Sequence, residues 1–350
     1  MRTVWITPGF ASDEKDTSCI PTLQDLALAL KKRAEEIIIV ALDYPFRKEE
    51  YYWNGIKVYS FGNSNKGLVY KLKLLRDVWS LLRKLNQEKK IDVVHSFWLT
   101  WPAIAGQHFC KQNSLPHIQT IMGRDAMNNR FHRWFDFNFS TIVNLSEFSN
   151  NVFYNSTGRK ADAVIPFGTA KFSTSNNSKD VDLINVGSVT RLKNQFDFLK
   201  IVKDVQQKKS NVKAVLIGNF FDRNLVHELS KYINRFCLNE NIQLLNEMPR
   251  GEVFNWMSRS KIMVHTSLYE SQGMVMQEAI AHGCKVYSTG NGIQFKHSMF
   301  QLFSIEDKTI SELLYRDLVK VNQSSGHVLI GIEETANTYF NLYSLNQKIR

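Results

Sequence analysis

Short apolar runs alternate with amphipathic stretches through most of the chain. In the first half, strand-length runs at Val4–Ile6 and Ile37–Leu42 flank a stretch with helical periodicity at Leu23–Ala34. Apolar runs of about four to eight residues are typical of buried strands, and a helix between two of them provides a parallel crossover. This pattern predicts the opening of a doubly wound α/β sheet, which binds ligands at the carboxyl ends of its strands.

The alternation continues into the second half. We expect further strands at Ile91–His95 and Ile118–Ile121, and then a second sheet that begins at Leu183–Ser188. The other strands of the second sheet are predicted at Val212–Gly218, Asn241–Leu245 and Ile262–His265. A chain of 350 residues exceeds one ordinary hydrophobic core, so two domains are expected.

Composition narrows the class of protein. The apolar share of 43% is typical of globular chains, and no apolar run has the length of a membrane span. The four cysteines are scattered without a C-x-x-C pair, which argues against a disulfide framework or zinc site and favours a reducing cytoplasm. The chain starts directly in a strand-like run, so no signal peptide is expected. The net charge of +11 fits an anionic membrane surface better than nucleic acid, for which no recognition motif is present.

One stretch of the second half carries the strongest candidate chemistry. The strand at Ile262–His265 is followed by a turn at Glu270–Gly273 and by a predicted helix at Met274–His282. A helix start presents backbone N–H groups and the positive end of a dipole, so it can bind an anion such as a phosphate. The anion would lie over the backbone of Gln272, Gly273 and Met274.

Two glutamates flank this predicted anion site. Glu270 precedes the helix and Glu278 lies one turn inside it, so both can face the same crevice. Carboxylates accept hydrogen bonds from sugar and ribose hydroxyls, and the arrangement therefore suits a nucleotide sugar. The alternative is a pair of glutamates on a solvated helix face, which the spacing by itself favours.

The residues around both glutamates resemble a known family signature. Ser-Gln-Gly-Met follows Glu270, Glu-Ala-Ile-Ala-His-Gly begins at Glu278, and seven residues separate the two glutamates. This is similar to the donor-site signature of the retaining GT-B glycosyltransferases of family four, the "glycosyl transferases group one" type. The resemblance implies an α/β protein of the GT-B fold, with two Rossmann-like doubly wound domains and an interdomain cleft. It implies an acceptor-side domain at residues 1–165, a nucleotide-sugar-binding domain at 166–330 and a C-terminal helix at 331–350 that returns to the first domain.

The resemblance also assigns site residues. Arg191 and Lys193 match the positions that supply cations to the donor diphosphate, where they would neutralise the charge that grows on the leaving group. Without the family context, Arg-Leu-Lys after a strand would indicate only surface decoration. Glu270 would orient the sugar and support positive charge at its ring, and Glu278 would hold the ribose. The remaining predicted donor contacts in this half are Gly187, Gln272, Gly273, Met274 and Val275.

No metal and no further cofactor are expected beside the nucleotide diphosphate sugar, which is a co-substrate. GT-B enzymes of this type use basic residues and helix amides where other transferases use a metal ion. The D-x-D sequence Asp180-Val181-Asp182 is typical of metal-dependent sugar transferases of another fold. Here it enters a predicted strand, and a strand edge is the stronger interpretation.

The first half departs from the family pattern. Gly9 ends the first strand and could either contact ligand or form a simple tight turn. The loop after it lacks the two glycines that are usual in the family. Met122 stands where many members have a His near the donor sugar, so any role of that His is absent or moved. Asp125 could face the acceptor crevice or cap the next helix. For His95, a structural histidine is the stronger interpretation. These departures keep open an alternative function, a catalytically silent GT-B-shaped binding or scaffold protein.

Residues 66–90 form the most charged segment, with eight Lys/Arg against two acids. Apolar residues recur there at helical spacing, namely Leu72, Leu75, Trp79, Leu82 and Leu85. A basic amphipathic helix can lie on an anionic bilayer, whereas an ordinary crossover helix would pack its apolar stripe on the sheet. Both can hold if the basic side chains face lipid; the candidates are Lys71, Lys73, Arg83 and Lys84.

The expected activity is therefore transfer of a hexose-type sugar from a nucleotide diphosphate sugar to an acceptor hydroxyl, with retention and without a metal. The acceptor would be a carbohydrate or a lipid-linked molecule, in the synthesis of a surface polysaccharide or glycolipid. We expect the protein in the cytoplasm, with peripheral binding to the inner face of the cell membrane as one possibility.

Overall fold

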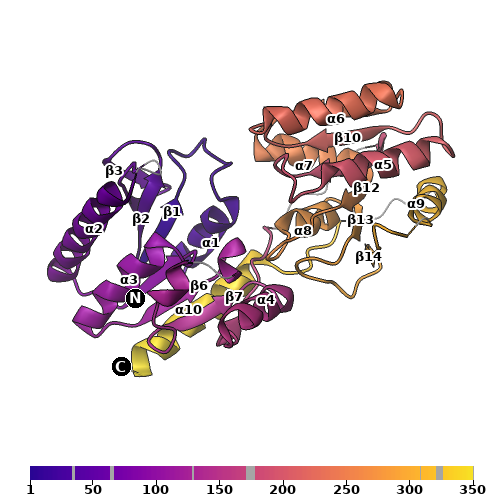
Figure 1. Ribbon diagram of the computed structural model, residues 1–350. Helices are drawn as coiled ribbons and strands as arrows, with labels where there is room; N and C mark the ends of the chain where they lie inside the picture. Colours follow the sequence, from indigo (N-terminus) through magenta and orange to yellow (C-terminus); the bar gives the residue numbers. More distant parts are fainter. Residues whose placement is uncertain are drawn as a thin grey trace. The chain divides into compact units, whose positions relative to one another are not determined.

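The computed structural model describes residues 1–33, 36–63, 67–127, 130–170, 178–307, 309–320 and 326–349. It separates into two compact units, each with its own sheet (Figure 1). Unit 1 comprises Met1–Gly168 and Ile330–Arg350, and unit 2 comprises Thr169–Leu329. The sequence places these divisions at 165/166 and 330/331. The polar stretch Ser173–Lys179 is predicted from the sequence to be a linker, and residues 173–177 of it lie outside the described residues.

Unit 1 is built on an eight-stranded sheet with the order β3-β4-β2-β1-β5-β6-β7-β8. All neighbouring strands are parallel except β3 and β4, which form an antiparallel pair. The strands are β1 (Arg2–Gly9), β2 (Glu36–Tyr44), β3 (Glu49–Trp53), β4 (Ile56–Ser60), β5 (Val93–Phe97), β6 (His117–Thr120), β7 (Thr141–Asn144) and β8 (Ala163–Val164). The helices are α1 (Pro21–Lys31), α2 (Leu68–Glu88), α3 (Trp101–Asn113), α4 (Glu147–Thr157) and α10 (Ile332–Ile349), with 3-10 turns η1 (Arg124–Ala126) and η2 (Arg130–Arg133).

Helix α2 covers one face of this sheet, as the crossover-helix interpretation predicts. Its apolar stripe packs on the central strands β1 and β2, with Leu74, Leu75, Val78, Leu82 and Leu85 all buried. One of the cations expected to face lipid is not available for that role. Lys71 is buried, and its ammonium donates to Asp43 at 2.6 Å. Lys66 lies outside the described residues.

Helix α10 packs on unit 1, as expected for a C-terminal helix that returns to the first domain. Tyr339 and Tyr343 are fully buried, and the Tyr343 hydroxyl lies 2.7 Å from Nδ1 of His95. The other ring nitrogen of His95 lies 2.8 Å from the Thr120 hydroxyl. Burial lowers the pKa of His95 well below its ordinary value, so the ring is neutral and structural.

A β-hairpin at the edge of the sheet was not predicted. Strands β3 and β4 are joined by Asn54 and Gly55, both with positive φ. Two residues of this kind between strands form the tight turn whose twist matches that of a hairpin. The hairpin extends the sheet beyond the edge of β2.

Unit 2 is built on a six-stranded parallel sheet with the order β11-β10-β9-β12-β13-β14. Its strands are β9 (Val181–Val186), β10 (Ala214–Ile217), β11 (Ile242–Leu245), β12 (Ser260–His265), β13 (Lys285–Ser288) and β14 (Phe300–Leu302). Its helices are α5 (Gln195–Gln206), α6 (Arg223–Arg235), α7 (Arg250–Arg259), α8 (Met274–Ala281) and α9 (Ile310–Val319). Helix α8 ends one residue before the predicted end at His282, and Gly283 follows with a φ of 76°.

The order of the strands fixes where a ligand can bind in unit 2. Chain order runs outward from β9 to β10 and β11 on one side, and from β12 to β14 on the other. The loops after β9 and β12 therefore leave neighbouring strands at the reversal point, where open α/β sheets form their binding crevice. In the part of the chain that the structure describes, no helix combines the length and apolar character needed to cross a membrane.

Candidate functional site

Two loops at the carboxyl ends of β9 and β12 form the centre of the candidate site. They are held together by hydrogen bonds from Leu268 N to Leu192 O, at 2.8 Å, and from the Thr266 hydroxyl to Lys193 O, at 3.0 Å. Below them, the Asn185 amide donates to Val264 O at 2.8 Å across the same strand pair. The reversal point thus fixes the position of Lys193 relative to the loop that carries Glu270.

The carboxylate of Glu270 is the point on which the polar side chains converge. The Lys193 ammonium forms an ion pair with Oε1 of Glu270. The same oxygen accepts a hydrogen bond from the Ser267 hydroxyl at 3.1 Å and lies 3.2 Å from Nε2 of His265. His265 also lies 3.2 Å from the Ser288 hydroxyl through Nδ1. The structure therefore brings together two of the three predicted catalytic residues, Lys193 and Glu270.

These contacts determine the charge of Glu270, whose side chain is only 13% exposed. Burial raises the pKa of a carboxyl group, but the hydrogen bond with His265 and the charge of Lys193 outweigh it and lower the pKa to about 2. Glu270 is consequently an anion at any pH at which the protein works. An anion can accept hydroxyl hydrogen bonds and stabilise nearby positive charge, but it cannot serve as a proton donor.

The backbone around Glu270 is shaped by glycines. The aliphatic part of Lys193 runs along Gly187, where a Cβ would lie 3.6 Å from Cδ of the lysine. Gly273 is the N-cap of α8 with a φ of 81°, and a Cβ there would collide with Cε of Met276. Since the first amides of a helix lack a full set of partners within the helix, the start of α8, which follows the loop of Glu270, can offer donors to an anion.

The predicted contacts around Gly273 differ in exposure. Gln272 is buried, and its carbonyl accepts from Ile293 N at 2.9 Å. Met274 and Val275, the first residues of α8, are half-buried.

Glu278 is held by a residue that the sequence analysis did not select. Its Oε1 accepts from Nε of Arg250 at 3.2 Å and from a terminal nitrogen at 2.8 Å. Arg250 also lies over the ring of Phe254, which stacks on His282. Side chains on α7 and at the end of α8 thus anchor the second glutamate.

Arg191 is the predicted catalytic residue that does not join the cluster. Its side chain is 75% exposed and lies 3.5 Å from Glu228 on α6. A pair of this length and exposure contributes little to stability, so Arg191 can leave Glu228 at low cost.

The two predicted contacts in the first half belong to unit 1. Gly9 ends β1 and packs against Tyr44, whose Cβ would lie 3.2 Å from a Cβ at position 9. Asp125 is buried, and its carboxylate accepts from Leu99 N at 2.8 Å and from Gly123 N at 2.6 Å. Both amides precede Asp125 in the chain, so its two interpretations, the acceptor crevice and a cap of the next helix, stay predictions. Burial raises the pKa of Asp125 although these amides lower it.

The D-x-D aspartates lie at the start of strand β9, as interpreted from the sequence. Asp180 pairs with Arg259 at 2.6 Å, and Asp182 is buried between Lys209 and Lys261 at 2.8 and 2.9 Å. Within the described ranges, no group of three or more His, Cys, Asp or Glu side chains is arranged to hold a metal ion.

His265, Ser267 and Arg250 contact the two glutamates but were not selected from the sequence. A signal existed for His265, which is the last residue of a strand at the predicted ligand-binding edge, five positions before Glu270. For Arg250, the spacing of 28 residues to Glu278 gives no such signal.

Two family models match the chain, one in each half. The model described as "Glycosyltransferase Family 4" matches residues 22–165, and the model described as "Glycosyl transferases group 1" matches residues 167–294. Lys193, Glu270 and Glu278 all fall inside the second match.

Two relatives from Methanocaldococcus jannaschii are both described as uncharacterized glycosyltransferases. One is 30% identical over 106 residues, which span 30% of this chain but only 25% of that protein. The other is 25% identical over 276 residues, which span 75% of this chain and 73% of that protein.

Solved structures share the fold over the whole chain. Sucrose-phosphate synthase from Thermosynechococcus elongatus has a TM-score of 0.79 at 12% identity and covers 100% of both chains. HepE from Anabaena, solved in complex with UDP and glucose, has a TM-score of 0.70 at 16% identity and covers 100% of this chain and 98% of its own. The catalytic domain of starch synthase IV from Arabidopsis thaliana, bound to ADP and acarbose, has a TM-score of 0.64 at 12% identity and covers 99% of each chain.

Proposed function

Because the chain belongs to the glycosyltransferases of the GT-B fold, with a family 4 region followed by a group 1 region, we propose that it transfers a hexose from a nucleotide diphosphate sugar to an acceptor hydroxyl. The observation that carries this proposal is the Lys193–Glu270 pair beside the start of α8. It places a cation, an anion and helix amides at the reversal point of one sheet, where a diphosphate and its sugar require them.

In the proposed chemistry, the cations and amides bind the diphosphate, and the two glutamates bind the sugar and the ribose. Lys193 and the first amides of α8 bind the diphosphate and stabilise the negative charge that develops as the bond to the sugar breaks. Arg191 leaves Glu228 and adds a second cation. Glu270 accepts hydrogen bonds from the sugar and supports positive charge at its ring, while Glu278, held by Arg250, binds the ribose.

The transfer is proposed to retain the anomeric configuration. The acceptor oxygen forms a bond to the anomeric carbon on the face from which the diphosphate leaves, and a phosphate oxygen takes the acceptor proton. This route is supported by the pKa of Glu270, because a carboxylate with a pKa of about 2 is a poor base for a hydroxyl proton. We further propose that no metal ion is needed, since Lys193 and the α8 amides supply the positive charge. Turnover in the presence of EDTA tests this point.

The donor base is chosen by analogy with the structural neighbours. HepE was solved with UDP and starch synthase IV with ADP, so UDP-glucose and ADP-glucose are the first donors to test. A thermal-shift screen of nucleotide sugars with the purified protein should give a rise in Tm with at least one donor.

Two substitutions test the assigned roles once a donor is known. Lys193→Ala should lower kcat by at least about 100-fold with a small change in KM, because its charge is needed mainly in the transition state. Glu278→Ala should mainly weaken donor binding. Lys200→Ala removes an exposed lysine of α5 and serves as the control. Wild-type turnover in the Lys193 variant would contradict the mechanism.

The alternative is a GT-B-shaped binding protein without catalysis. The loop after Gly9 and the Met122 position favour it, because both depart from the family pattern. Slow hydrolysis of the bound nucleotide sugar by the purified wild-type protein, absent in Lys193→Ala, would exclude this alternative.

We also propose that the protein binds the anionic inner face of the cell membrane while it glycosylates a lipid-linked or surface-polysaccharide acceptor. The support comes from the first turns of α2, where large apolar side chains face solvent next to cations. The exposed fractions are 60% for Leu68, 79% for Val69, 57% for Tyr70 and 57% for Leu72. Lys73 and Arg76 are exposed on the same turns. Apolar side chains that enter the headgroup region beside cations are typical of interfacial helices.

A further inference from the structure

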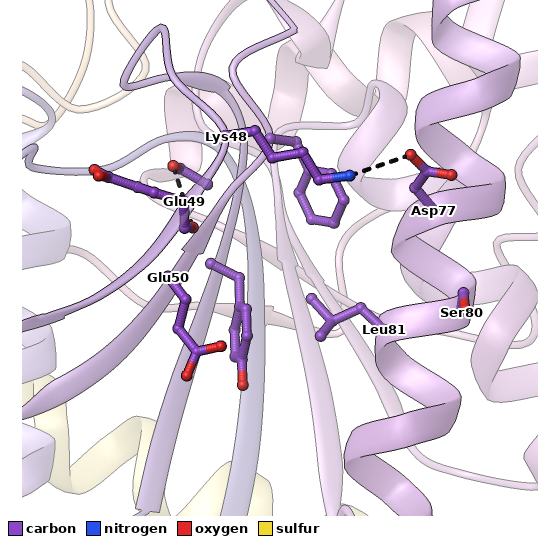
Figure 2. Close-up of a pocket in the computed structure, with 9 residues that line it drawn as sticks. Lys48, Glu49, Glu50, Asp77, Ser80 and Leu81 are labelled. Atoms are coloured by element: carbon purple, nitrogen blue, oxygen red, sulfur yellow. Dashed lines mark hydrogen bonds and ion pairs between the residues drawn. The ribbon is translucent and has the colours of Figure 1, made fainter.

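A groove in unit 1 lies outside the candidate site and between α2 and the β3–β4 hairpin. It has a volume of about 490 Å³ and is lined by Lys48, Glu49, Glu50, Tyr59, Ser60, Phe61, Asp77, Ser80 and Leu81. Figure 2 shows Glu49 and Glu50 on the hairpin side and Asp77, Ser80 and Leu81 on the helix side, with Lys48 reaching across to Asp77. The volume falls in the range of about 300–1,000 Å³ that is usual for small-molecule sites.

The groove follows from the edge position of the hairpin. Along β4 burial alternates, with Ile56, Val58 and Ser60 buried and the residues between them half-buried. The half-buried face carries Tyr59, and Phe61 continues it beyond the strand. Helix α2 packs on β1 and β2, and Tyr59, Phe61 and Leu81 are partly buried against the same apolar cluster.

The lining combines apolar surface with carboxylates that form ion pairs. Asp77 pairs with Lys48 at 3.5 Å, Glu50 pairs with Lys57 at 2.6 Å, and Glu49 pairs with Arg47. The side chains of Asp77 and Glu49 are 28% and 29% exposed, and that of Glu50 is 50% exposed. Figure 2 shows the carboxylate of Glu49 turned away from the groove, whereas Glu50 and Asp77 lie beside it, so these two carboxylates are the acceptors that the groove offers.

This chemistry suits a neutral oligosaccharide. A hexose ring presents an apolar face of C–H groups, which packs on aromatic and aliphatic side chains, and a rim of hydroxyls, which donate to carboxylates. The lysine that lines the groove, Lys48, is paired with Asp77, so the groove offers little positive charge to a phosphate-bearing ligand.

We propose that the groove binds a short neutral glycan, the part of the acceptor chain that does not react. The identification of this glycan as the acceptor rests on the proposed function, whereas the binding of sugar in the groove does not. A transferase that extends a chain gains from holding several of its sugar residues, since the additional contacts position the end that reacts.

The test measures glycan binding to the full-length protein by isothermal titration calorimetry and saturation-transfer NMR. The probes are maltohexaose, cellohexaose, chitohexaose and mannohexaose, with spermidine as a cationic competitor. We expect at least one hexasaccharide to bind. Ser80→Trp, which fills the groove from an exposed helix position, should weaken binding by at least about tenfold, or about 1.4 kcal/mol. Gln87→Trp, at an exposed position of α2 outside the groove, is the matched control.

A second variant controls for an indirect structural effect of the tryptophan that Ser80→Trp introduces. Tyr59→Ala should weaken binding of the same hexasaccharide, while Tyr154→Ala, at an exposed tyrosine of α4, should leave that binding unchanged. The proposal is overturned if no hexasaccharide binds, if Ser80→Trp binds as the wild type does, or if spermidine alone binds. Binding of UDP-glucose is measured on the same samples and should be unchanged in Ser80→Trp. If the wild type bound neither UDP-glucose nor ADP-glucose, the donor site would lose its support and the groove would not, so the two failures are distinguishable.

Discussion

At the scale of single residues, the chemistry depends on one carboxylate and its three partners. Glu270 accepts from Lys193, Ser267 and His265, and the folded protein holds its pKa at about 2, below the ordinary 4.5. A group with a depressed pKa stabilises the fold above the unfolded pKa, and that contribution is lost as pH falls toward the folded value. The contribution of ionised Glu270 to stability is therefore lost between about pH 5 and about pH 2.

This gives a prediction for the pH dependence of stability. The contribution of ionised Glu270 should fall by about 1 kcal/mol between pH 7 and pH 4, and by about 2 kcal/mol at pH 3. Glu270→Gln lacks this titration, so the difference between wild type and variant in unfolding free energy should narrow by these amounts. Urea unfolding at pH 7, 5 and 4 measures it. A difference that stays constant over this range would show that Glu270 is not held as a buried anion.

Gly273 offers a second prediction at this scale. Gly273→Ala should cost about 1–2 kcal/mol for a left-handed backbone, and more because the new Cβ collides with Met276. Gly158→Ala is the matched control, since its φ of 72° is similar and nothing lies within 4 Å of the added Cβ. Both variants should lose stability in urea, but only Gly273→Ala should also lose affinity for the donor, because the strain lies at the start of α8. Equal donor affinity in the two variants would argue against phosphate binding there.

The sequence predicted the continuous stretch around Glu270, but it missed contacts both near and far, namely those of His265 and Ser267 with Glu270 and that of Arg250 with Glu278. Glu270, Gly273 and the helix after them form one continuous stretch, so strand, turn and helix could all be expected. Lys193 was assigned through its resemblance to the family, and the fold places it against Glu270. Arg250 forms its pair only because α7 and α8 pack together, which no local pattern encodes.

At the scale of elements, helix α2 has both a buried apolar stripe and an exposed apolar group. Its buried stripe was predicted from helical periodicity, and the structure confirms Leu75, Leu82 and Leu85 as buried but leaves Leu72 57% exposed. Periodicity did not reveal the exposed apolar group at Leu68–Leu72, because the prediction assigned Leu72 to the buried stripe. It also did not reveal the hairpin, although Asn54-Gly55 between alternating residues is a strong hairpin signal.

The exposed start of α2 carries the prediction for membrane binding. The double variant Leu68→Ser/Val69→Ser should lose most of its sedimentation with vesicles of phosphatidylglycerol and phosphatidylcholine, because it removes the apolar group that enters the headgroups. Leu345→Ser, at a side chain of α10 that is 58% exposed, is the control. Lys73→Gln/Arg83→Gln should weaken binding mainly at low salt. Equal sedimentation of wild type and the α2 double variant would reject docking through this helix.

At the scale of the whole molecule, unit 2 is a single continuous segment inserted into unit 1. The chain leaves unit 1 at Gly168 and returns beside it, since a Cβ at Gly168 would collide with the backbone of Gly331. Unit 2 has apolar clusters of its own on both faces of its sheet. Unit 1 depends on α10, which contributes the buried Tyr339 and Tyr343.

These facts predict how the chain can be divided. Residues 169–329 should fold alone, with cooperative thermal unfolding by circular dichroism. Residues 1–168 alone should not, because each large side chain lost from the core removes about 1.5–3 kcal/mol from a total of about 5–15 kcal/mol. Joining residues 330–350 to Gly168 through a short glycine-rich linker should restore folding of unit 1. Stable folding of 1–168 without this helix would contradict the assignment of α10 to the core.

The close approach of Gly168 and Gly331 has a consequence for how such a protein diversifies. A segment whose two ends meet can be exchanged as a cassette, because only two neighbouring junctions must be preserved. If unit 2 binds the activated sugar as proposed, recombination at these junctions would replace the choice of that sugar and leave the rest of the framework intact. Chimeras built at the same two positions would be the natural starting point for engineering new donor preferences.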